Sequence, residues 1–140
     1  MSMMFEASVP PLLRTLGALS GILAKTEAHC ADRKIEPLAL LGFRLFPDMF
    51  AFTRQVQLSC DFAARTAARL TGADLPKFPD TETSFAELQA RIEAATAFVR
   101  GIEAARFAGA ETREIVIPMR GTEMRMPGLQ YLTQYSLPQF

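Results

Sequence analysis

The chain has 140 residues, enough for one domain with a sizeable apolar core that needs no disulfide or metal to hold it together. Lysine and arginine balance aspartate and glutamate at 15 each, so the composition favours neither a nucleic acid nor a membrane as partner. Cys30 and Cys60 are too few for a disulfide framework, which indicates a reducing cytoplasm.

The first predicted helix runs from Ser8 to about Asp32. Ser8 is expected to cap it, and Pro10 and Pro11 would then fall in the first turn, where a missing N–H costs nothing. The start, "MSMMFEAS", lacks the basic residues of a secretion signal, and we expect neither a signal peptide nor a membrane span. Apolar residues recur at intervals of three and four, as on one helical stripe: Val9, Leu12, Leu13, Leu16, Leu19, Ile22 and Leu23.

The stretch "RLFPDMF", residues 44–50, predicts the start of a second helix over 47–71. Pro47 has its φ preset for the first helical position, and Asp48 puts negative charge where the helix dipole is positive. Arg44 lies four residues before Asp48, within reach of an ion pair if the backbone coils there. The apolar stripe of this helix consists of Met49, Phe52, Val56, Cys60, Ala63, Ala67 and Leu70.

Residues 73–83, "ADLPKFPDTET", predict a connection, and "SFAE" predicts a capping box from Ser84 to Glu87 that begins a third helix. That helix should end near Phe107. At roughly 3.3 Å per residue the connection can span about 35 Å, comparable with the second helix, so the two helices can lie parallel. The third helix has its own apolar stripe: Phe85, Leu88, Ile92, Ala95, Val99 and Ile102.

The segment "REIVIPMRGTEMRMPG" changes to the pattern of an edge β-hairpin, with β-branched residues at 115–117 and a turn at 120–123. Helical spacing then resumes in "GLQYLTQYSLPQF", residues 128–140. Met119, Met124 and Met126 either line an adaptable pocket together with Phe78 or simply pack the hairpin onto the helices.

The runs "LAKTEAHCADRKIEPLALLGFRLFPDMFAFTRQVQLSCDFAARTAARLTG", "KFPDTETSFAELQARI" and "YLTQYSLPQF" resemble the family of unknown function DUF1993, a branch of the DinB/YfiT-like superfamily. The resemblance implies an all-α fold: a four-helix bundle of up-down-down-up type with a small β-hairpin before the fourth helix. Because the family continues past "LPQF" into an aromatic and histidine-containing helix, we expect the fourth helix to be incomplete here.

Many superfamily members hold a divalent metal with three histidines, one on the second helix and two on the fourth. Residues 47–71 contain no histidine, and His29 is the only one in the chain. We therefore expect no metal and no cofactor. A metal site near the end of the first helix would have to combine Glu27, His29, Cys30 and Asp32 with Asp61 or Gln55. In the alternative interpretation, a cationic His29 interacts favourably with the negative end of the helix dipole and binds no metal.

The best polar constellation is a candidate cleft made of Glu27, His29, Arg44, Asp48 and Gln55. It leads to a hypothesis of a cytoplasmic, non-metal module that binds a small-molecule ligand or serves as an accessory protein. One alternative is a metal- or thiol-dependent transferase or hydrolase of the superfamily. Another is a structural homodimer that covers the apolar surface beside an incomplete fourth helix.

Overall fold

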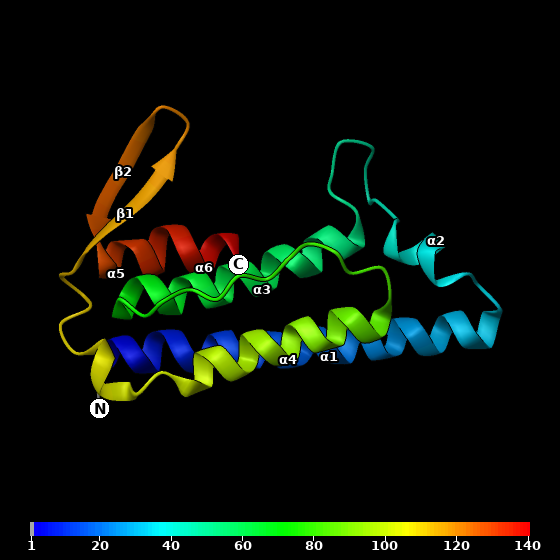
Figure 1. The fold of residues 1–140 in the computed structure, drawn as a ribbon, viewed down its shortest axis with the longest axis horizontal. Coiled ribbons are helices and arrows are strands. Elements are labelled where there is room, and N and C mark those ends of the chain that lie inside the picture. Colours follow the sequence, from blue (N-terminus) through cyan, green and yellow to red (C-terminus); the bar gives the residue numbers. More distant parts are fainter. Residues whose placement is uncertain (1) are drawn as a thin grey trace.

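Three long helices and a C-terminal helical segment lie side by side, and a β-hairpin projects at one end (Figure 1). The computed structural model describes residues 2–140. Its elements in chain order are α1 (Met3–Arg33), α2 (Pro37–Leu41), α3 (Phe52–Thr71), α4 (Phe85–Gly101), the 3-10 helix η1 (Ala104–Phe107), β1 (Glu114–Met119), β2 (Thr122–Pro127), α5 (Gly128–Gln130), the π-helix η2 (Tyr131–Ser136) and α6 (Leu137–Gln139). The expectation of a mostly helical chain with a small hairpin is confirmed.

Helix α1 begins at Met3, five residues before Ser8, so the predicted start was wrong. Ser2 caps it, since its Oγ accepts a hydrogen bond from the Phe5 N–H at 3.3 Å. Ser8 is buried within the helix, where its hydroxyl donates to the Met4 carbonyl at 2.6 Å. Pro10 and Pro11 therefore lie inside the helix, and each removes one backbone hydrogen bond. Burial of the apolar stripe of this helix compensates for the loss.

The second long helix also begins later than predicted. Residues 44–50 form an exposed loop, and α3 starts at Phe52, because the short helix α2 and this loop occupy the stretch before it. Arg44 donates to the Met49 carbonyl at 2.6 Å, which holds the loop closed. No ion pair joins Arg44 to Asp48 among residues 2–140. The predicted C-terminal glycine is confirmed, since Gly72 has φ 71°.

The connection and the third predicted helix form largely as expected. Residues 72–84 run back along α3, so that α3 and α4 start at the same end and run in the same direction (Figure 1). Ser84 Oγ accepts from the Glu87 N–H at 3.1 Å, while the Glu87 carboxylate accepts from the Thr83 N–H at 2.6 Å. The helix ends at Gly101 instead of Phe107, because the backbone becomes extended at Ile102.

The hairpin and the start of the C-terminal segment lie at the end of the molecule opposite α2 (Figure 1). Strands β1 and β2 pair antiparallel, with Ile115 opposite Met126 and Ile117 opposite Met124, and the two isoleucines are buried. Gly128 follows, at a point where an added Cβ would lie 1.8 Å from the Ala110 carbonyl oxygen. Only glycine fits there without a shift of the backbone.

Buried apolar residues form two clusters along the helices. One lies near the hairpin and includes Leu70, Val99, Phe107 and Tyr131, and the other surrounds Leu16, Cys60 and Leu88 toward α2. Phe78 packs against the second cluster, whereas Met124 and Met126 pack against the first, so the suggested pocket combining them was wrong. The hairpin methionines at 124 and 126 serve to pack the hairpin.

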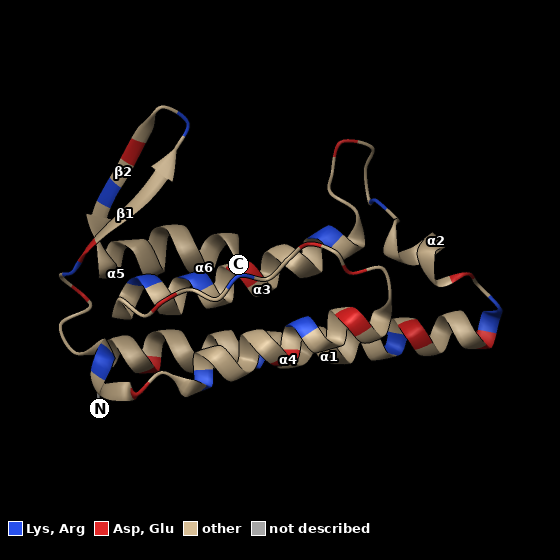
Figure 2. Cartoon of the chain, in the orientation of Figure 1, with Lys and Arg blue, Asp and Glu red and all other residues tan. Residues whose placement is uncertain are grey.

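Charges of both signs occur at both ends of the molecule (Figure 2). Among the helices in the described part of the chain, α1 alone is long and apolar enough to cross a membrane by length and composition. It packs against α3 and α4, yet only 28% of its most apolar window is buried, and both core helices and signal sequences near the N-terminus meet the same criteria.

Candidate functional site

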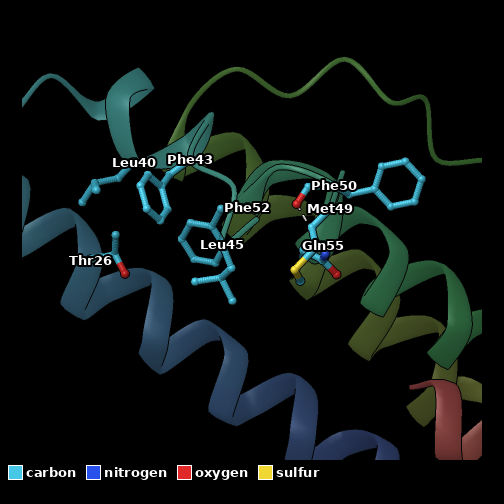
Figure 3. Close-up of a pocket in the computed structure, with 8 residues that line it drawn as sticks. All are labelled: Thr26, Leu40, Phe43, Leu45, Met49, Phe50, Phe52 and Gln55. Atoms are coloured by element: carbon cyan, nitrogen blue, oxygen red, sulfur yellow. Dashed lines mark hydrogen bonds between the residues drawn. The ribbon is translucent and has the colours of Figure 1, made fainter. Parts of the chain in front are cut away.

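An apolar hollow of about 410 Å³ lies between α1, α2 and the start of α3. Figure 3 shows Phe43, Leu45 and Phe52 between the two long helices, with Leu40 beside Phe43 and with Thr26 on α1. The lining is almost entirely apolar and contains no ionisable side chain: Thr26, Leu40, Phe43, Leu45, Met49, Phe50, Phe52 and Gln55.

Two polar side chains border the hollow. Gln55, near the start of α3, donates through Nε2 to the Phe50 carbonyl at 3.4 Å, and the Phe50 ring points away from the other lining side chains (Figure 3). Thr26 donates its hydroxyl proton to the Ile22 carbonyl at 2.8 Å, so toward the hollow it offers only an acceptor. Gln55 keeps its oxygen and one N–H proton for another partner.

The loop over this hollow exposes large apolar side chains to an unusual degree. Leu45 is 81% exposed, Phe46 64% and Phe43 57%, and clustered exposed apolar side chains of this kind often mark a binding surface. The loop is nevertheless fixed at Arg44, as described above, and at Arg54, whose guanidinium lies 5.9 Å from the centre of the Phe50 ring. The contacts of Arg44 and Arg54 therefore fix the loop that forms the wall of the hollow.

The residues of the predicted cleft are not gathered at one point. Gln55 lines the hollow, while Arg44 and Asp48 lie in the exposed loop beside it. Glu27 and His29 are exposed on the last turns of α1 and do not line it. Asp48 precedes α3, so it lies outside the helix that the sequence predicted to contain both Asp48 and Gln55.

A buried arginine that sequence reasoning missed organises the neighbouring region. The Arg91 side chain is 1% exposed and reaches three carboxylates, those of Asp61 at 2.8 Å, Asp80 at 2.9 Å and Glu82 at 3.0 Å. Its guanidinium also lies 5.7 Å from the centre of the Phe78 ring. Burial alone lowers the pKa of Arg91, but hydrogen bonds to Glu82 and Asp61 raise it above its usual value, so the group stays charged.

This arginine network is connected to the wall of the hollow. Arg54 donates to Asp80 at 2.9 Å and to Gln57 at 3.3 Å, and Gln57 donates to Glu82 at 2.9 Å. Since Arg54 also contacts Phe50, one set of polar contacts joins the loop, α3, the connection and α4. The signal for it in the sequence was a single arginine next to Ile92 within an otherwise apolar stripe.

The two cysteines are buried and have free thiols. Burial is the main cause that raises the pKa of Cys60 to about 12, with Asp61 and Glu82 adding to the rise against the opposing effect of Arg91. A thiol with so high a pKa is a poor nucleophile at neutral pH. Its predicted place in the core is confirmed.

The family model of the domain of unknown function DUF1993 matches residues 4–140. The chain belongs to the DUF1993 family. No curated protein matches it. A crystal structure of a DinB family member protein from Shewanella denitrificans has 34% sequence identity and a TM-score of 0.89, over 97% of this chain and 77% of that one. The resemblance to DUF1993 within the DinB-like superfamily is therefore confirmed.

The described residues of this DUF1993 member do not supply the three metal-binding histidines that the resemblance implied. Within residues 2–140, no three histidine, cysteine, aspartate or glutamate side chains are placed to hold a metal ion. His29 is exposed near the end of α1. Helix α3, on which the resemblance implied one metal-binding histidine, contains none. The donor set of the described residues does not fit such a metal, and we derive no reaction step through one.

Proposed function

We propose that this DUF1993 protein is a non-metal binding module whose site is the apolar hollow between α1, α2 and α3. The observation that supports it most is the combination of a hollow of about 410 Å³ with exposed aromatic side chains held in place around it. Ligand sites in proteins are typically concave, mainly apolar and supplied with a few polar groups, and the hollow has these three properties.

The test is a ligand screen on a variant pair. Phe43→Asp puts a charge into the wall of the hollow, and Met119→Asp puts the same charge at a comparably exposed position on the hairpin. Small neutral compounds that raise the melting temperature of the parent protein should bind the hairpin variant equally well and the Phe43 variant at least about tenfold more weakly. Equal binding to the two variants would remove the hollow from consideration.

A second candidate is a homodimer that buries the exposed loop. The exposure of three large apolar side chains, those of Leu38, Leu45 and Phe46, supports this second proposal. Phe46 does not line the hollow, so Phe46→Asp separates the two proposals. In light scattering, a dimer through the loop should dissociate in this variant, while small-molecule binding at the hollow should persist. A parent protein that stays monomeric at high concentration excludes the dimer.

The metal- or thiol-dependent enzyme is the alternative with less support. The raised pKa of Cys60 and the lack of a fitting donor set in the described residues argue against it. Stoichiometric transition metal in the purified protein, retained on dialysis against a weak chelator, would favour this alternative.

We also propose that the segment α5–η2–α6 belongs to the fourth helix of an up-down-down-up bundle. Its direction, opposite to that of α3 in Figure 1, supports this, as does the buried hydrogen bond between Thr66 of α3 and Ser136 of η2. A bundle of this kind would explain why α3 and α4 need the long connection between them.

A further inference from the structure

We infer that the hollow selects neutral ligands that carry one uncharged polar group, such as a hydroxyl or a primary amide, on an apolar body. This inference rests on the proposed function and specifies the chemistry of the same site. It follows from the polar groups that border the hollow and from the charged groups that its lining lacks.

The first step concerns charge. The lining side chains include no lysine, arginine or histidine to pair with a carboxylate, and no aspartate or glutamate to pair with an ammonium. An ion that leaves water for such a surface loses hydration without gaining a counter-ion, which costs more than the apolar contacts of a small ligand return. Of the arginines next to the lining residues, Arg54 is paired with Asp80, and Arg44 donates to the Met49 carbonyl.

The second step concerns the polar end of the ligand. Gln55 presents a carbonyl oxygen and an N–H proton that its contact with Phe50 does not use, so it can accept and donate at once. Thr26 adds an acceptor on the opposite wall, since its proton is directed to the Ile22 carbonyl. A group that is both donor and acceptor, as a hydroxyl or primary amide is, can bond to the free oxygen and the free N–H proton of Gln55, whereas a pure hydrocarbon can bond to neither.

The third step concerns the body of the ligand. Phe43, Leu45 and Phe52 face the hollow from the loop and from α3, and Met49 lies beside Gln55 with its sulfur toward the open space (Figure 3). The unbranched methionine adapts its shape to a ligand at low cost. An aliphatic or aromatic body therefore contacts these residues while its polar end reaches Gln55.

The test uses four probes with one common chain: 1-octanol, octanamide, octanoate and n-octylamine. Titrations followed by backbone amide chemical shifts suit the protein, which has no tryptophan to serve as a fluorescent reporter. We expect the alcohol and the amide to bind at least about tenfold more tightly than the two ions at neutral pH. We expect Gln55→Leu to weaken octanol binding about fivefold, and Gln130→Leu, an exposed glutamine outside the hollow, to leave it unchanged.

The outcomes separate the inference from the function on which it rests. If none of the four probes binds, the proposed function fails and the inference fails with it. If all four bind alike, or if an ion binds best, the hollow is a binding site but the inference is overturned. It is likewise overturned if Gln55→Leu binds octanol as tightly as the parent protein does.

Discussion

Replacing Arg91 by methionine should be among the most damaging single substitutions in the chain. The side chain is 1% exposed, and two of its three carboxylate partners are also largely removed from water, Glu82 at 11% and Asp61 at 19% exposure. Methionine preserves much of the apolar volume but leaves these carboxylates without their cation. Breaking a buried pair from one side typically costs about 3–5 kcal/mol, because the remaining charge is left uncompensated.

The loss is large enough to measure directly. For a domain of this size, about 3–5 kcal/mol corresponds to a fall in melting temperature of roughly 10–20 °C. Circular dichroism at 222 nm during urea and thermal unfolding gives both quantities. Arg125→Met is the matched control, since Arg125 forms two ion pairs on the hairpin but is 54% exposed, and such surface pairs contribute about 1 kcal/mol or less.

A double mutant isolates the pairwise interaction. Glu82→Gln removes one of the stranded charges, so the double mutant Arg91→Met/Glu82→Gln should lose at least about 1 kcal/mol less than the sum of the two single losses. The reasoning fails if Arg91→Met costs no more than Arg125→Met, or if the two losses simply add. Either result would mean that water reaches this network freely.

Three further predictions concern other parts of the chain. Gly128→Ala should cost about 2–3 kcal/mol in urea unfolding, because the new Cβ would meet the Ala110 carbonyl oxygen at 1.8 Å. Glu87→Gln should reduce the loss of stability on acidification. The hydrogen bond from the Thr83 N–H lowers the pKa of Glu87 below its usual 4.5 in the folded protein. The ionised Glu87 therefore stabilises the fold above about pH 4.5, and this contribution is lost as the pH falls through the lower pKa of the folded state. This is checked by urea unfolding between about pH 3 and pH 7. Cys60 should resist iodoacetamide at pH 8 in the folded protein and react in urea, because burial raises its pKa to about 12; peptide mass spectrometry reports the modified site.

The glycine and glutamate predictions each have a control within the chain. Gly21→Ala adds a Cβ that meets nothing within 4 Å inside α1, so it should raise stability by up to about 1 kcal/mol. Glu93→Gln changes an exposed glutamate of α4 and should leave the acid dependence as it is. Predictions are contradicted if Gly128→Ala is as stable as Gly21→Ala, if the two glutamate variants respond to acid alike, or if folded Cys60 is alkylated rapidly.

The predictable parts of the fold were those fixed by local signals. The capping box at Ser84, the apolar stripe of α4 and the glycine after α3 each express a local preference that packing reinforces. The start of α1 was mispredicted because Pro10 and Pro11 resemble a first turn. Burial of the stripe on both sides of the prolines outweighs their local preference, and a single sequence does not reveal that balance.

The candidate site was less accessible to sequence reasoning. "RLFPDMF" has the residues of a helix start, yet the loop is held by contacts of Arg44 and Arg54 with backbone and side chains that only the folded chain brings near. Gln55 was singled out for a polar cleft and instead borders an apolar hollow. The aromatic residues around it look like core residues in the sequence, and their exposure depends on where α1 and α3 lie.

The parallel course of α3 and α4 has a consequence for how the chain folds. Asp61 and Arg91, which meet across these helices, are separated by 30 residues. Two helices joined by a short turn can pair progressively outward from that turn, but this pair has no shared turn from which to start. The chain must first close the long loop between α3 and α4, and the entropy of loop closure is lost before any α3–α4 contact can stabilise the pair. Folding should therefore be slower than in an up-down bundle of equal length, with the α3–α4 contacts among the later ones to form.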